Sequence, residues 1–227
     1  MQTLKDRPEY IGTLPTELSG QKVVIIDELH SGTVKIKGHA DIIIVALLNK
    51  GWEELKKIKF DFEDQDAKLQ FIALIIGSNS DSFELETISN HHVPHTNATY
   101  YIRSAMFDRS RIDFRGNIII EKGAHQTDSY LAHHSLMLSP NAKTDTEPCL
   151  EIEADDVAAG HAATVGRVDE HLLFYLQSRG LDRHQAQDVL IKGFLESDLD
   201  RIPNHQLQEI LAESIACLMP TSPSSTA

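Results

Sequence analysis

Several features typical of secreted, membrane and metal-binding proteins are missing from this chain of 227 residues. Its two cysteines, Cys149 and Cys217, are too few for a disulfide scaffold or a site of four cysteine ligands. The longest strongly apolar run, from Ile42 to Leu48, is far too short to cross a bilayer. The N-terminal residues MQTLKDRPEYIGTLP lack the apolar segment of a signal peptide, so we expect a cytoplasmic protein with no membrane partner.

Positive charge and aromatic residues are also scarce. Lys and Arg number 21 against 34 Asp and Glu, which gives a formal net charge of −13. Nucleic acids and anionic membranes require basic surfaces, so this balance argues against both as main partners. Aromatic residues make up 6% of the chain and hydrophobic residues 41%. The composition is that of a globular protein whose core consists mostly of Ile, Leu and Val.

Common catalytic and nucleotide-binding motifs do not occur. The chain has no G-x-x-x-x-G-K-[ST] loop for ATP, no G-x-S-x-G elbow, no H-E-x-x-H and no His-x-His. The pairs His91-His92 and His133-His134 each offer one ligand at most to a common site, because neighbouring side chains on a strand point to opposite faces. Solvent-exposed loop histidines are therefore favoured over a metal enzyme, and Cys217 is interpreted as a small buried side chain.

Residues 21–166 repeat a short unit in which two apolar residues are separated by one residue of any kind and flanked by polar residues. This alternation is typical of a strand with one buried face. The first apolar positions are 34, 60, 83, 112 and 136, and successive positions differ by 26, 23, 29 and 24. Another unit begins at Cys149, and it follows position 136 much sooner than this spacing allows, so we expect it on a different face.

Short strands that return about every two dozen residues suit a parallel β-solenoid, whose core forms only when successive coils stack. A β-sandwich remains open at this point, although its strands usually return about every 8–12 residues. Gly116-Asn117 and Lys122-Gly123 are candidate corners, since Gly and Asn tolerate a positive φ.

The pattern changes to helical spacing after residue 167. Asp169 can cap a first helix that ends before Gly180, and Asp182 can cap a second. Pro203 suits the first turn of a third helix. The inward faces are expected to contain Leu172, Leu173 and Leu176, then Ala186, Val189, Leu190 and Phe194, then Leu207, Ile210, Leu211, Ser214 and Leu218. We thus expect a lead-in segment (1–20), a β-solenoid (21–166), a helical subdomain (167–219) and a disordered tail (220–227).

The stretch 150–180 carries a family resemblance. Its LEI-x-ADDV strand, its HAATVG turn and its D-E-x-x-L-F-Y-L-x-S-R-G helix resemble the SufB/SufD family of iron–sulfur cluster assembly scaffolds, and the SufD branch more closely. The following helix contains the similar pattern A-x-x-x-L-I-x-G-F. This resemblance implies a mainly β fold, with a right-handed parallel β-helix core and a C-terminal three-helix subdomain. Family members usually carry a long N-terminal helical region, so this chain resembles a minimal version.

The resemblance implies scaffolding and not turnover. SufB and SufD pair through their β-helices, and their C-terminal helices dock the ABC-type ATPase SufC. We therefore expect residues 169–200 to bind a SufC-type ATPase, with amphipathic helices suited to groove recognition. A helical cap over one end of the solenoid is the alternative for this region, and the two roles are compatible. The expected docking residues are Phe174, Tyr175, Arg179, Leu190 and Phe194.

The resemblance also implies a cluster-assembly interface at His161 and His133. His161 stands where SufD-type proteins place an interface histidine, and a neutral imidazole can bind iron. His133 stands where SufB-type proteins carry a cysteine, and Ala159 replaces the cysteine of the SufD turn. Thiolates are the preferred cluster ligands. We therefore expect no stably bound cofactor, but a transient iron–sulfur cluster shared with a SufB-like subunit.

Two other functions remain open on the residues alone. One is a carbohydrate-active β-helix enzyme, which a cytoplasmic location would disfavour. The other is a self-associating β-helix without a cluster role. The resemblance leaves open whether the natural pair is a homodimer or a heterodimer.

Overall fold

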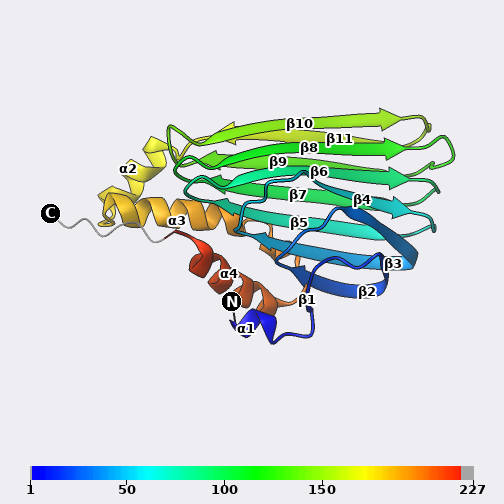
Figure 1. Cartoon of the computed structure of the whole chain (residues 1–227), viewed down its shortest axis with the longest axis horizontal. Coiled ribbons are helices and arrows are strands. Elements are labelled where there is room, and N and C mark those ends of the chain that lie inside the picture. Colours follow the sequence, from blue (N-terminus) through cyan, green and yellow to red (C-terminus); the bar gives the residue numbers. More distant parts are fainter. Residues whose placement is uncertain (1, 221–227) are drawn as a thin grey trace.

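The computed structural model describes residues 2–220, and within them the chain winds into a parallel β-solenoid followed by helices (Figure 1). A short helix precedes the strands, and every recorded strand pairing is parallel. The N-terminal elements and first coils are α1 (Gln2–Lys5), β1 (Tyr10–Gly12), β2 (Glu17–Ile26), β3 (Gly32–Leu48), β4 (Lys56–Phe62) and β5 (Lys68–Gly77). The later coils are β6 (Ser82–His91), β7 (Asn97–Met106), β8 (Arg111–Ile120), β9 (Asp128–Met137), β10 (Lys143–Ile152) and β11 (Ala158–Gly166).

Each later coil consists of two strands that belong to two facing sheets. The hydrogen-bonded order is β10-β8-β6-β4-β3-β5-β7-β9-β11, so β3 contributes to both sheets and β10 and β11 lie at the ends. Ser82 pairs with Arg111 and Arg111 with Lys143, so the chain completes one full coil between each residue and the next along this row. The solenoid interpretation is confirmed, and the sandwich is excluded.

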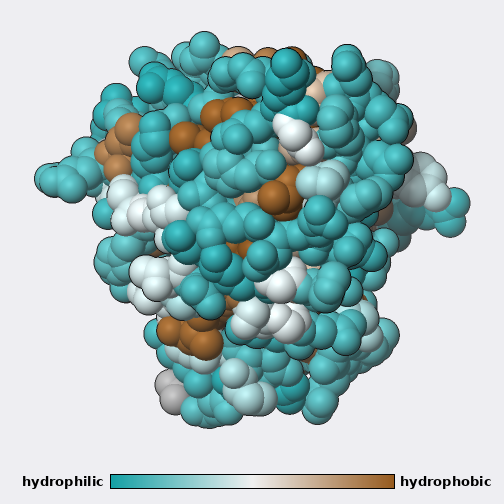
Figure 2. Space-filling model, turned by 90° about the vertical axis from the view of Figure 1, so that its right-hand side faces the viewer, coloured by the Kyte–Doolittle hydropathy of each residue, from teal (hydrophilic) through white to brown (hydrophobic). Residues whose placement is uncertain are grey.

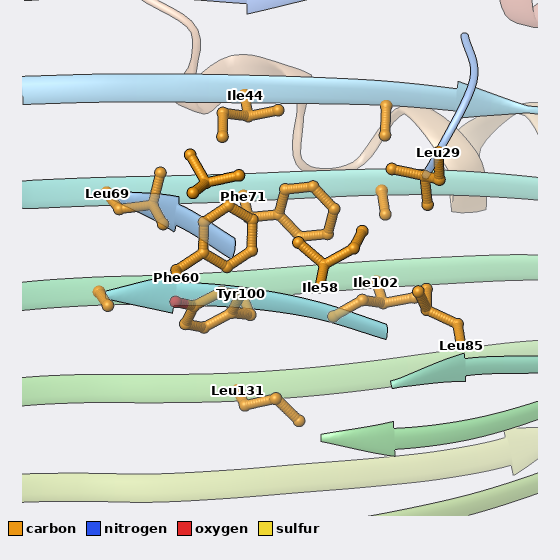
Figure 3. Packing of buried hydrophobic residues seen from close by; sticks show 14 of the residues in the cluster. Leu29, Ile44, Ile58, Phe60, Leu69, Phe71, Leu85, Tyr100, Ile102 and Leu131 are labelled. Atoms are coloured by element: carbon orange, nitrogen blue, oxygen red, sulfur yellow. The ribbon is translucent and has the colours of Figure 1, made fainter. Parts of the chain in front are cut away.

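Alternating side chains from both sheets fill the space between them. Figure 3 shows Phe60, Phe71 and Tyr100 close together at the centre of this core, with Leu131 one coil further along. The Phe60 and Phe71 ring centroids are 5.4 Å apart, and the Phe60 and Tyr100 centroids 5.8 Å. Because no coil buries its inward face alone, this stacking supplies the hydrophobic stabilisation of the solenoid.

The first two C-terminal helices begin at the capping residues that the sequence predicts, whereas the third begins after Asn204, so Pro203 precedes it and does not lie in its first turn. The C-terminal elements are α2 (Glu170–Ser178), α3 (Arg183–Glu196), the 3₁₀ turn η1 (Leu199–Arg201) and α4 (His205–Leu218). Asp169 accepts from the His171 N–H, and Asp182 forms a capping box with Gln185. Gly180 follows α2 with φ +98°, a conformation that favours glycine.

Helices α3 and α4, with the turn η1 between them, cover the outer face of one sheet and create a second apolar cluster there (Figure 1). From the sheet, Val45, Ile72 and Leu74 point outward into this cluster. The helices contribute Ile191, Leu195, Leu199, Ile202, Leu207, Leu211 and Ile215. The helical region is therefore packed on the side of the solenoid. No helix among residues 2–220 is long and apolar enough to span a membrane.

The repeated units lie in strands as predicted, but the prediction that each unit stacks on the unit of the previous coil is wrong. Phe60 pairs with Ser89 near the end of β6, and not with Phe83 at its beginning. The unit 135–139 begins in β9 of the opposite sheet, whereas the Cys149 unit lies in β10, in the same sheet as the units that begin near 34, 60, 83 and 112. Lys122-Gly123 does lie in a corner, but Gly116-Asn117 lies within β8.

Several boundaries and faces also differ from expectation. The first long strand, β2, begins at Glu17, and the expected lead-in also contains α1 and β1. On α3, Val189 is half exposed, and the buried side chains are Ala186, Ile191 and Leu195. Leu172 on α2 and Cys217 on α4 are exposed. Residues 221–227 of the expected disordered tail lie outside the described residues.

Candidate functional site

The last coil leaves one edge of each sheet without a neighbouring strand. Within residues 2–220, β10 pairs only with β8 and β11 only with β9. Such edges expose backbone N–H and C=O groups that can pair with another chain. The exposed strands carry both Cys149 and His161, so the structure brings the predicted interface histidine to a free edge.

His161 lies in the middle of strand β11 and not in a turn, which corrects the sequence interpretation. It is in register with Leu131, which in turn aligns with Tyr100 and Phe71. Those three side chains point into the core, so His161 belongs to the inward face of the last coil. It is nevertheless exposed, because its strand lies at the edge.

His133 lies on the same inward face one coil deeper, aligned with Ala163. It is fully buried, and its ring nitrogens lie 2.9 Å from Ser104 Oγ and 3.0 Å from Thr146 Oγ1. Burial lowers its pKa to about 3, with a smaller contribution from His134, so the ring is neutral at pH 7. His133 and His161 therefore lie on neighbouring strands, but only His161 is open to a partner.

The interpretation of the histidine pairs as exposed loop residues is wrong for His91 as well as for His133. His91 is fully buried at the end of β6, stacked on Phe62 with ring centroids 4.4 Å apart. Its nitrogens contact Ser89 Oγ at 2.8 Å and Thr96 Oγ1 at 2.7 Å. The described residues contain no group of three or more His, Cys, Asp or Glu that could hold a metal ion. Iron at His161 would need ligands from elsewhere.

A second candidate surface lies on α2. Phe174 is 73% exposed and Tyr175 is 55% exposed, and the Arg179 guanidinium lies 5.3 Å from the Tyr175 ring centre. Leu190 is half-buried on α3. Phe194 differs from the others because it packs against the second apolar cluster, with the Arg103 guanidinium 5.2 Å from its ring centre. Phe174, Tyr175 and Arg179 thus form the accessible part of the predicted docking surface, which we call the α2 patch.

A buried ion pair connects the helical region to the sheet. The sequence did not predict it. Asp198 is 3% exposed and lies 2.5 Å from Arg103 Nε and 3.0 Å from Arg201 Nε. The Arg201 guanidinium also lies 3.9 Å from the ring centre of Tyr101 on β7. This arrangement holds the base of the helical region in a fixed position on β7.

The surface that the described residues form at the corner end of the solenoid is mainly polar, with scattered apolar residues (Figure 2). Figure 2 looks onto the end where β4, β6, β8 and β10 turn into β5, β7, β9 and β11, and most of this surface is hydrophilic. Left-handed backbone at Asp66, His95, Gln126 and Asp156 forms these corners. The free edge and the α2 patch thus carry the exposed site residues that the sequence predicts, His161, Phe174, Tyr175 and Arg179.

The match to a family model covers the strands that form the free edge and the helix that carries the α2 patch. Residues 27–194 match the family described as SUF system FeS cluster assembly, SufBD core domain. The chain is 31% identical to the iron–sulfur cluster assembly protein SufD of Escherichia coli over 149 residues, which are 65% of this chain and 35% of that protein. It is 35% identical to SufD of Bacillus subtilis over 140 residues, which are 61% of this chain and 31% of that protein.

A SufBD family protein of Synechocystis is 32% identical over 157 residues, covering 68% of this chain and 34% of that protein. The chain thus aligns with about a third of the length of these relatives. The family match runs from Asp27, just after β2, to Phe194 in α3. On this match, together with its parallel solenoid and C-terminal helices, the chain belongs to the SufBD core family of the SUF system.

Proposed function

We propose that this chain is a SufD-like, non-catalytic scaffold subunit in iron–sulfur cluster assembly. The observation that carries the proposal is the family match over residues 27–194, which includes both the free edge and the α2 patch. The match favours this role over a carbohydrate-active enzyme. In this role the helices bind a SufC-type ABC ATPase, and the edge of the solenoid binds a SufB-like subunit or a second copy.

The docking of an ATPase is supported by the chemistry of the α2 patch. Aromatic residues and Arg are enriched at the centres of protein interfaces, where burying their large side chains contributes most of the binding energy. Phe174 and Tyr175 project from a helix whose Leu173 is buried, so they are held in place without being covered. A groove on the partner could take these rings, as amphipathic helices are commonly recognised.

Pairing through β10 and β11 is supported by their free edges and by the position of His161. Its imidazole could bind iron at the interface, while thiolates of the partner supply the remaining ligands. Cys149 is exposed, but it lies on the outer face of β10, away from the inward face that carries His161. The cluster is the cargo of this interface, and the chain alone would hold it only transiently.

The ATPase assignment is tested by co-purifying the full chain with a SufC-type ATPase encoded in the same genome. Phe174→Ala/Tyr175→Ala should abolish co-purification, since both rings are exposed and their loss leaves the core intact. Ile11→Ala/Leu55→Ala is the matched control, because it removes two exposed apolar side chains distant from α2 in the sequence. Equal ATPase recovery by both variants would contradict the docking assignment.

The interface assignment is tested with His161→Ala in a cluster reconstitution that contains the SufB-like and SufC-type proteins. We expect a reduced cluster yield, measured by absorbance and iron content, with folding and ATPase binding unchanged. His30→Ala removes another exposed imidazole and serves as the control. A normal cluster yield from His161→Ala would remove His161 from the assembly site.

A further inference from the structure

Helix α2 is attached to the rest of the chain by few contacts. Its one fully buried side chain is Leu173, whereas Leu172, Phe174 and Tyr175 are exposed. Within residues 2–220, neither of the two apolar clusters includes a residue of α2, although α3 and α4 contribute several to the second cluster. Figure 1 shows α2 next to α3 and beyond the ends of the strands. The helix that carries the α2 patch is therefore the least anchored of the three C-terminal helices.

An incompletely filled cleft lies beside α2. It has a volume of about 340 Å³ and is lined by residues of α2, of α3 and of the loop that joins β9 to β10. Leu173 borders the cleft from α2, and Leu138 and Pro140 border it from the loop. Protein interiors are normally packed without such space, so the side chains around it lack part of their contact energy. Leu173 thus holds α2 less firmly than a leucine in the solenoid core holds its strand.

One ion pair joins α2 to α3 at this cleft. Both oxygens of the Glu170 carboxylate accept hydrogen bonds from the Arg183 guanidinium, at 2.8 and 3.1 Å. Glu170 lies in the first turn of α2 and Arg183 in the first turn of α3, and both line the cleft. These hydrogen bonds lower the pKa of Glu170 and raise the pKa of Arg183, so both groups are charged at pH 7. Exposed ion pairs usually contribute little to stability, but bidentate pairs of this kind contribute more.

The order of α2 depends on these contacts because the helix is short. It has 9 residues, and isolated helices shorter than about 12–15 residues are marginal in water. Residues 167–169 connect it to β11 and residues 179–182 connect it to α3, with Gly180 at φ +98° in the second connection. Elements with few buried apolar contacts can open locally while the rest of a protein stays folded. The structure therefore has a short helix, an incompletely filled cleft behind it and one ion pair across the cleft.

We propose that α2 is a latched arm. The Glu170–Arg183 pair, which we call the latch, holds the arm closed beside the cleft, and the arm opens as a unit while the solenoid, α3 and α4 remain folded. The closed arm presents Phe174 and Tyr175 together on one helix, and the open arm loses this arrangement. Ions that compete for either partner of the latch favour the open arm. Only the consequence for docking rests on the proposed function, since a partner that binds the α2 patch would select the closed arm.

Hydrogen exchange of the full chain, without any partner, tests the latch at pH 7. Amides of α2 should exchange at least about tenfold faster than those of α4. Arg183→Gln removes the partner of Glu170 without changing α2 itself, so it should speed exchange in α2 by a further factor of about three to five and leave α4 unchanged. Lys192→Gln is the matched control, because Lys192 pairs with Glu196 within α3. Added salt should speed exchange in α2 of the wild type but not of Arg183→Gln.

The conservative variant Arg183→Lys keeps the charge but not the two parallel hydrogen bonds, so it should retain only part of the protection of α2. Exchange in α2 as slow as in α4 would overturn the proposal, and so would an Arg183→Gln variant whose α2 exchanges like the wild type. Equal acceleration of α2 and α4 by Arg183→Gln would also overturn it, because the whole chain would then be destabilised. A SufC-type ATPase should slow exchange in α2. An ATPase without this effect would refute docking to the α2 patch and leave the latch unaffected.

Discussion

Arg103 on β7 and Asp198 before η1 form an ion pair of 2.5 Å between residues 95 positions apart in the chain. The Asp198 carboxylate also accepts from Arg201, so two guanidinium groups depend on one buried acid. This acid connects the helices, which carry the α2 patch, to β7 in the sheet that ends at β11. The relative position of the two proposed binding surfaces therefore depends on this contact.

Asp198→Asn should lower the free energy of unfolding by about 3 kcal/mol, because it leaves the partly buried Arg103 without its counter-charge. The measurement is a urea titration followed by circular dichroism. Asp200→Asn, two positions later and exposed, is the control and should change stability by less than about 0.5 kcal/mol. Equal effects of the two substitutions would show that Asp198 does not fasten the helices.

Acid should destabilise the protein below about pH 6.5, the usual pKa of histidine in an unfolded chain. Burial lowers the pKa of His91 and His133 to about 3, so the unfolded state takes up protons that the folded state excludes. The stability from these groups is complete above about pH 6.5 and is lost as the pH falls toward 3.

His133→Gln should reduce the slope of unfolding free energy against pH by about 1 kcal/mol per unit between pH 6 and 5. This window lies above the range in which the lowered carboxyl pKa values of Asp61 and Glu63 act. The measurement is a series of urea titrations across the window. An unchanged slope would mean that His133 is protonated in the folded protein.

Gly116→Ala should destabilise the protein by about 1–3 kcal/mol through overpacking. A Cβ atom at Gly116 would lie 2.4 and 2.9 Å from the terminal methyl groups of buried Leu131. Thermal unfolding measures the effect, and Leu131→Val in the same chain should restore part of the loss. Gly123→Ala, with no atom closer than 3.8 Å, is the control. A neutral Gly116→Ala would show that this region of the core is loosely packed.

The sequence predicted the class of fold because its signals are local. Period-two alternation marks strands, and Asp169, Asp182 and Gly180 mark helix ends through contacts within a few residues. The register of the coils is not local. The unit at Phe83 begins a long strand, whereas the unit at Phe60 ends a shorter one, so counting from unit to unit underestimated the length of this coil.

The candidate site was predicted in part for the same reason. His161 and the rings on α2 were found through motifs in the chain. The ring nitrogens of buried His133 form hydrogen bonds with Ser104 and Thr146, which lie on other strands, 29 and 13 residues away in the sequence. The sequence suggests a corner at Gly116, and only the structure shows that the Leu131 side chain packs against this position. Asp198 lies in an ordinary acidic stretch, and no pattern there indicates its partner Arg103.

In the proposed function, the α2 patch docks a SufC-type ATPase while the solenoid provides the assembly edge. Calorimetric titration of the purified ATPase into the full chain tests it most directly. We predict one-to-one binding that Phe174→Ala/Tyr175→Ala abolishes and Ile11→Ala/Leu55→Ala retains. Absence of binding to the wild type, or equal affinity for both variants, would contradict a docking role of the α2 patch.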